Sequence, residues 1–192
     1  MAPAASGIIC RVPSTRIFTT SEAPAGVLDK IRRLLEQAFD DGFSDDDWQH
    51  TLGGWHVVIL DDMDDSMDPV SHAAVVPRVL EVAGRPWHSG YVEGVATAPG
   101  RQREGLGSLA MSQLAPILRG NFDMGALSTG RHDFYERLGW ERWRGPSFAR
   151  RGRQLTRTAE EDDGLMVFRF GPSRDLDLSA AIVCESRTGD DW

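Results

Sequence analysis

The run Gln-Arg-Glu-Gly-Leu-Gly at residues 102–107 has the composition of a loop that binds phosphate. It follows an apolar stretch at residues 91–96 and opens an amphipathic one at residues 106–114, which predicts a strand, a loop and the start of a helix. A helix N-terminus presents unpaired N–H groups and the positive end of the helix dipole, so it attracts anions. Gly105 and Gly107 leave the backbone open to a pyrophosphate group.

Arg101 and Arg103 add positive charge beside these glycines. The pattern is short, and a strand-to-helix turn that binds nothing would carry it equally well. Two other phosphate loops fit less well. No Lys-Ser/Thr pair follows the glycines, which disfavours a nucleoside-triphosphatase loop. The spacing is not G-x-G-x-x-G and no βαβ unit precedes it, which disfavours a dinucleotide fold.

Composition limits the class of protein and its partners. A chain of 192 residues, 41% hydrophobic and 26% charged, predicts one globular domain over residues 1–192. No apolar run reaches the roughly 18–20 residues of a membrane span, and the N-terminus does not resemble a signal peptide. The net charge of −8 disfavours a nucleic-acid partner and favours a cationic one, although an acidic surface that only aids solubility is the alternative for the total charge. Cys10 and Cys184 form no disulfide framework, so we expect a cytoplasmic protein.

Turn and cap residues divide the chain into alternating elements. We expect a helix that starts at Pro24 and a short second helix capped by Ser44. Two more helices are expected from residue 106 and over residues 131–138, the latter ended by Gly139. The expected strands lie at residues 7–20, 55–60, 70–82, 87–96, 124–128, 140–143, 165–170 and 179–183. A polar hairpin connection is expected over residues 61–69.

The phosphate loop resembles the Q/R-x-x-G-x-G/A loop of the GCN5-related N-acetyltransferases, the GNAT proteins. A second signature follows, because Tyr135 and Gly139 match their Y-x-x-x-G-F element, with Trp140 in the place of the Phe. The resemblance implies an α/β fold, with a mixed α+β sheet whose central strands splay apart around acetyl-CoA. It implies that the Tyr135 hydroxyl protonates the departing thiolate, although a tyrosine that only packs on the sheet is the alternative. The residues that the resemblance assigns to acetyl-CoA are Val95 and Thr97 for the pantetheine arm and Gln102, Arg103, Gly105, Gly107 and Ser108 for the pyrophosphate.

Glu93 is the carboxylate best placed to act as a base, since it lies on the strand beside the expected cofactor. An amine must lose its proton before it can attack, and Glu93 could take that proton directly or through water. A Glu that binds substrate or forms a salt bridge is an equal alternative. The five histidines show no metal-ligand spacing, so no metal is expected.

Longer segments resemble the aminoglycoside 2'-N-acetyltransferases. The matching runs include Trp-Gln-His-Thr-Leu-Gly-Gly at residues 48–54 and the ending Gly-Asp-Asp-Trp at residues 189–192. The resemblance implies an acidic pocket for a cationic aminosugar, lined by Asp47, Glu93, Ser128, Asp162, Asp190 and Trp192. One departure is Gly42, which stands where the family has an acid, so that Asp41 is the nearest substitute. The hairpin at residues 61–69 is also longer and more acidic than the family pattern.

The resemblance thus implies a homodimeric enzyme that transfers acetyl from acetyl-CoA to the 2'-amine of aminoglycosides, directly within a ternary complex. Two alternatives stay open. The acceptor could be a cell-wall aminosugar or a polyamine, or the chain could be an acyl-CoA sensor without turnover.

Overall fold

The computed structural model describes residues 13–61 and 68–192. Within these residues, ten strands form one mixed sheet with the order β6-β9-β5-β4-β3-β10-β7-β8, and β1 and β2 extend it beside β3. The strands are β1 (Ser14–Thr19), β2 (Trp55–Leu60), β3 (Pro69–Val82), β4 (Arg85–Thr97), β5 (Met124–Ser128), β6 (Glu141–Arg142), β7 (Ser147–Arg151), β8 (Gln154–Arg157), β9 (Leu165–Arg169) and β10 (Ile182–Glu185). The predicted α/β fold with a mixed sheet is confirmed.

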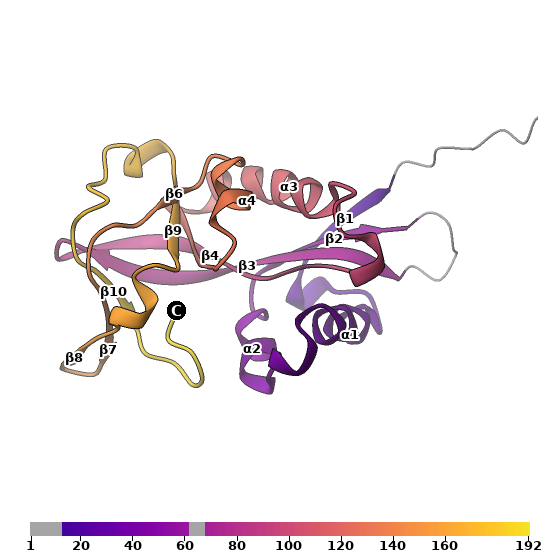
Figure 1. Cartoon of the computed structure of the whole chain (residues 1–192), viewed down its shortest axis with the longest axis horizontal. Coiled ribbons are helices and arrows are strands. Elements are labelled where there is room, and N and C mark those ends of the chain that lie inside the picture. The colour runs from indigo at the N-terminus through magenta and orange to yellow at the C-terminus, as the bar shows by residue number, and fades with distance from the viewer. Residues whose placement is uncertain (1–12, 62–67) are drawn as a thin grey trace, which may run out of the picture.

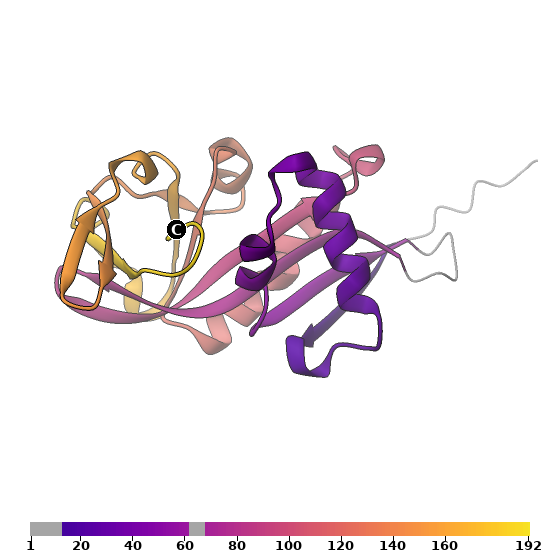
Figure 2. The ribbon, with the colours of Figure 1, turned by 90° about the horizontal axis from the view of Figure 1, so that it is seen from below.

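In the described part of the chain, four α-helices cover the sheet, two on each face (Figure 1). Helices α3 (Leu106–Asn121) and α4 (His132–Glu136) lie on one face, and α1 (Val27–Phe39) and α2 (Asp45–His50) lie on the other. Seen from below, the C-terminal strands curl beyond α2, and the chain ends between that curl and α2 (Figure 2). None of the helices in the described part of the chain is long and apolar enough to cross a membrane.

The two faces are held by separate apolar clusters. Leu114 and Leu118 of α3 are buried against β2 and β3, and Ile31 and Leu35 of α1 are buried on the opposite face. A third cluster fills the curl of the C-terminal strands and includes Trp192. Full burial of one such aliphatic side chain stabilises the fold by about 1.5–3 kcal/mol.

Strand β3 is the longest strand and has two different neighbours along one edge. Its first half, from Pro69 to Val75, pairs with β2, and its last residues, Leu80 to Val82, pair with β10. Its other edge pairs with β4 along most of its length. β3 therefore joins the N-terminal and C-terminal parts of the sheet.

The structure differs from the sequence expectations mainly near the C-terminus. A hairpin of β7 and β8 lies at residues 147–157, where no strand was predicted. All four residues of β8 are exposed, so its sequence lacks the apolar alternation by which a strand is predicted. The strand expected from residue 179 begins at Ile182. Residues 7–12 of the first expected strand, and most of the expected hairpin at 61–69, lie outside the described residues.

The central strands β4 and β5 are parallel and separate after a short paired stretch. They pair only from Ser89 to Tyr91 on β4, yet β4 continues to Thr97 and β5 to Ser128. A bulge bends β4 at the same place, because its register against β3 moves from Ala74↔Glu93 to His72↔Ala96. Gly94 lies in this bulge at φ +57°, and an added Cβ would be 2.8 Å from Cγ2 of Thr51. The predicted splay is thus present.

Candidate active site

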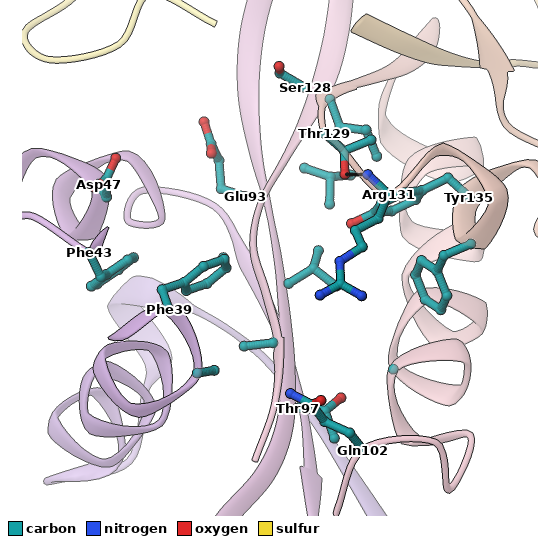
Figure 3. A pocket seen from close by; sticks show the side chains of 18 of the residues that line it. Phe39, Phe43, Asp47, Glu93, Thr97, Gln102, Ser128, Thr129, Arg131 and Tyr135 are labelled. Atoms are coloured by element: carbon teal, nitrogen blue, oxygen red, sulfur yellow. Dashed lines mark hydrogen bonds between the residues drawn. The ribbon is translucent and has the colours of Figure 1, made fainter. Parts of the chain in front are cut away.

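A cavity of about 970 Å³ opens where β4 and β5 separate. Figure 3 shows it between two walls. One wall comes from α1, α2 and the loop between them, with Phe39, Phe43 and Asp47, and the other from β5 and α4, with Ser128 and Tyr135. Glu93 lies between these walls on β4. The volume is of the size that accepts a cofactor or drug-like ligand.

The start of α3 forms one end of the cavity. Gly105 is the N-cap residue at φ +84°, and no side chain caps the helix, so the first N–H groups are left for a ligand. The first three helical residues, Leu106 to Ser108, line the cavity together with Gln102 and Arg103. Arg101 differs from the expectation, since it pairs with Asp61 and Glu104 and does not line the cavity.

Two further arginines line the cavity, and sequence reasoning missed both. Arg131 immediately precedes α4, and Arg137 follows it. With Arg103 they make three arginines that line the cavity, and none of the three forms an ion pair with an acid within residues 13–61 and 68–192. Positive charge that is free of acids, beside an open helix N-terminus, suits a ligand with several phosphate groups.

Glu93 lines the cavity but is already paired on one side. Its Oε1 lies 2.8 Å from Nη1 of Arg187, as an ion pair without the geometry of a directed hydrogen bond. Burial raises the pKa of the Glu93 carboxyl above its usual value, while Arg187 and Arg78 lower it. The salt bridge was one alternative left open for this residue, and its partner Arg187 was not predicted.

Tyr135 is buried in the opposite wall and lines the cavity. Its ring packs edge-on against Phe134, with the ring centres 4.9 Å apart, and against Trp140, with the centres 6.0 Å apart. Burial raises the pKa of the Tyr135 phenol well above its ordinary value. The hydroxyl is therefore protonated at neutral pH, as a proton donor must be.

Acidic groups line the other part of the cavity. Asp47 and Asp190 are both there, and Asp47 also accepts hydrogen bonds from the backbone and hydroxyl of Ser44, both at 2.8 Å. Ser128 lines the same region, with its Oγ 3.4 Å from Oε2 of Glu161. Together with Glu93, these carboxylates make a negative region that suits a ligand with several ammonium groups.

The structure differs from the prediction for Asp162. Its carboxylate accepts hydrogen bonds from the backbone and hydroxyl of Ser147 and pairs with Arg157, and it does not line the cavity. Arg157 and Ser147 lower the pKa of the Asp162 carboxyl to about 2. The neighbouring Glu161 lines the cavity in its place. The side chain of Asp41, the substitute proposed for the family's acid, lies outside the described part of the structure.

The Trp192 side chain is buried. Its Nε1–H donates to Oγ1 of Thr158 at 3.0 Å, and it lines the cavity next to Asp190. The tail is also held on α2, where Nε2 of His50 donates to the carbonyl of Thr188 at 2.9 Å. The tail thus forms part of the cavity wall, and its role in binding stays a prediction.

A buried pair of histidines, His56 and His72, is hydrogen-bonded to the β4 bulge at Gly94. Nδ1 of His72 lies 2.7 Å from the Gly94 carbonyl, which can only accept, so this nitrogen carries the proton. Nε2 of His72 then accepts from Nδ1 of His56 at 3.0 Å, and the Thr20 hydroxyl donates to Nε2 of His56 at 2.8 Å. Burial lowers the pKa of both rings, to about 4 for His56 and about 3 for His72, so both are neutral.

Comparisons with known proteins agree with this arrangement. The family model for an acetyltransferase (GNAT) domain matches residues 20–143. An aminoglycoside 2'-N-acetyltransferase of Mycolicibacterium fortuitum is 36% identical over 195 aligned residues, covering 100% of this chain and 96% of the relative. The chain belongs to the aminoglycoside 2'-N-acetyltransferase family of GNAT proteins.

Solved GNAT structures share the fold at low identity. The GNAT family N-acetyltransferase YhbS of Escherichia coli, solved in complex with CoA, has a TM-score of 0.65 and 17% identity, with 92% of this chain and 93% of that chain covered. A probable N-acyltransferase of Enterococcus faecalis has a TM-score of 0.55 and 16% identity over 69% of this chain. This chain spans 33% of the length of that longer protein.

Proposed function

We propose that this GNAT protein acetylates the 2'-amine of aminoglycosides with acetyl-CoA as co-substrate. The observation that carries the proposal is the division of charge within one cavity. Arg103 belongs to the loop before the open start of α3, and the Arg131 side chain extends toward that end of the cavity, whereas Asp47 and Glu93 lie away from it (Figure 3). The first region fits the phosphates of CoA, and the second fits an aminosugar with several ammonium groups. The full-length match to a relative with this activity supports the choice of acceptor.

When bound, acetyl-CoA supplies a thioester whose carbonyl carbon accepts the amine. One C–N bond forms and the C–S bond breaks. Glu93 takes the proton that the amine loses, directly or through a water, and Tyr135 gives its hydroxyl proton to the departing sulfur. In the proposed reaction, donor and acceptor are bound together, and the presence of both regions in one cavity supports this order. The homodimer and the cytoplasmic location stay predictions from the sequence.

A panel of acceptors tests this function most directly. Thiol release from acetyl-CoA is followed with aminoglycosides that carry a 2'-amine and with matched drugs that carry a 2'-hydroxyl, and NMR locates the acetyl group on each product. We expect turnover only of the 2'-amino compounds. Turnover of the 2'-hydroxyl set, or an acetyl group on another amine, would contradict the assignment.

The same panel separates the two alternatives. A spermidine or glucosamine derivative that turns over faster than every drug would favour the polyamine or cell-wall acceptor. No thiol release with any amine, alongside tight acetyl-CoA binding, would indicate a sensor without turnover.

Replacing one acid tests the anionic region of the cavity. Asp190 is exposed and lines the cavity, so Asp190→Asn removes one charge without loss of volume. We expect the KM for a 2'-amino drug to rise roughly 3–10-fold, which corresponds to about 1 kcal/mol for a partly exposed charge pair. The KM for acetyl-CoA should stay near the wild-type value, since α3 is a separate element.

Asp163→Asn is the matched control, because Asp163 is an exposed acid nearby that does not line the cavity. High salt should reduce the difference between wild type and Asp190→Asn, because the charge pair is screened. An equal rise in KM for both variants would mean that only the net charge matters.

A further inference from the structure

The ion pair between Glu93 and Arg187 lies behind the cavity wall. Glu93 lines the cavity and Arg187 does not, so the guanidinium approaches the carboxylate from the side of the tail. Both side chains are largely buried, with 17% of Glu93 and 18% of Arg187 exposed. Oε1 of Glu93 is the atom that meets Arg187, and it is shielded from solvent. The other oxygen, Oε2, is left to interact with a group in the cavity.

Arg187 is itself fixed by the residues that follow it. Its Nε–H donates to the carbonyl of Asp190 at 2.8 Å, and its backbone N–H donates to Oδ1 of Asp191 at 3.1 Å. Its guanidinium lies over the ring of Tyr91, 5.6 Å from the ring centre, and Arg78 lies over the same ring at 4.7 Å. One side chain thus connects Glu93 to the tail that carries Asp190 and Trp192.

We propose that Arg187 is a positioning residue for the acetyl transfer: it binds one oxygen of Glu93 from outside the cavity, keeps that carboxylate ionised and holds it in line with the tail. This inference rests on the proposed function, in which Glu93 accepts the proton. It assigns a role to a residue that does not touch either substrate.

The charges around Glu93 explain why such a partner is needed. Arg187 on the tail and Arg78 on β3 favour the charged carboxylate, whereas Asp47 on α2 and burial disfavour it, and Tyr91 on β4 lies alongside. Removal of Arg187 leaves a buried carboxylate with less positive charge beside it, so its pKa should rise. A carboxyl that holds its proton cannot accept one, so the acid limb of the pH–rate profile should move to higher pH.

Two substitutions at Arg187 test the proposal in the full-length protein. Arg187→Gln keeps a hydrogen-bond donor but removes the charge, and Arg187→Lys keeps the charge but loses the planar guanidinium. We expect the acid limb of kcat/KM for a 2'-amino drug to move up by about one pH unit or more in Arg187→Gln and to stay near the wild-type position in Arg187→Lys. A merely structural role would lower kcat/KM by the same factor at every pH.

Arg150→Met is the control, because Arg150 also bridges two acids, Glu81 at 2.7 Å and Glu185 at 3.4 Å, but does not line the cavity or meet Glu93. The acid limb of Arg150→Met should coincide with that of wild type.

Glu93→Gln provides a second measurement. In that background, Arg187→Gln should cost little further activity, because the group on which it acts is gone. An additional loss equal to that in the wild-type background would overturn the proposal.

A readout without turnover separates this inference from the proposed function. The ¹³C signal of the Glu93 carboxyl, assigned by its absence in Glu93→Gln, is titrated in the unliganded protein. We expect a higher midpoint in Arg187→Gln than in wild type. If wild type acetylates no 2'-amino drug, the proposed function fails while this titration still tests the ion pair. An unchanged midpoint, or a changed midpoint with an unmoved acid limb, overturns the role of Arg187.

Discussion

Tyr135→Phe should lower kcat by about 10²–10⁴-fold, the usual contribution of a general acid, while the Kd values of both substrates stay close to wild type. Phe keeps the ring that packs against Phe134 and Trp140, so the cavity wall is preserved. Only the hydroxyl is lost. Without it, the thiolate of CoA must leave without a proton from this group. Steady-state kinetics with calorimetric binding of each substrate separates the effect on turnover from the effect on binding.

Tyr91→Phe is the matched control, because the chain has 2 tyrosines and the Tyr91 side chain also lies buried in the fold. Tyr91 does not line the cavity, and Phe retains the ring over which Arg78 and Arg187 lie. Its turnover should be near that of wild type. Equal turnover of wild type and Tyr135→Phe would leave Tyr135 with a packing role only.

Gly107→Asp should weaken acetyl-CoA binding by about 10²–10³-fold. Gly107 is the second residue of α3, and a Cβ there would meet Oγ1 of Thr97 at 3.3 Å and Cζ of Phe134 at 3.6 Å, so a side chain can be accommodated with small shifts. An acid in the first turn is favourable for a helix. The fold should therefore persist, while a carboxylate stands where we propose the pyrophosphate. Like charges about 4 Å apart near a protein surface cost about 4 kcal/mol.

Equilibrium titration with acetyl-CoA measures this loss. Gly107→Ala adds the same Cβ without charge and should have a much smaller effect. Gly100→Asp adds the charge in the preceding loop, where a Cβ meets nothing within 4 Å and the residue does not line the cavity. If Gly107→Asp and Gly100→Asp weaken binding equally, the start of α3 is not the phosphate site.

Local patterns in the sequence were enough to predict the central elements. Strand β2 begins and ends where its apolar run predicts, and Ser44 caps α2 as expected, with its Oγ accepting from the Asp47 N–H at 3.1 Å. These features depend on residues close together in the chain. Most of the residues that the sequence assigned to the site do line the cavity. Most of these belong to motifs on or next to β4 and α3.

Features that depend on distant partners could not be read in the same way. Asp162 was assigned to the cavity by resemblance, but Ser147, 15 residues away, and Arg157 bind its carboxylate, and Glu161 lines the cavity instead. The pairing of Glu93 with Arg187 joins residues that are far apart in the chain. Hairpin β7–β8 was missed because β8 is exposed throughout and β7 buries only the small residues Ser147 and Ala149, while pairing with β10 sets its place.

The two neighbours of β3 have a consequence for how the chain assembles. Its first half pairs with β2, which lies just before it in the chain, whereas Val82 pairs with Ile182 near the other end. Contacts between residues close in the chain form at a lower entropic cost than contacts that close a long loop. The half of the sheet under α1 can therefore form from local contacts. The half next to Arg187 forms only when β10 pairs with β3. The acceptor region of the cavity then draws its acids from both parts, because Asp47 lies on α2 and Asp190 lies on the tail that follows β10.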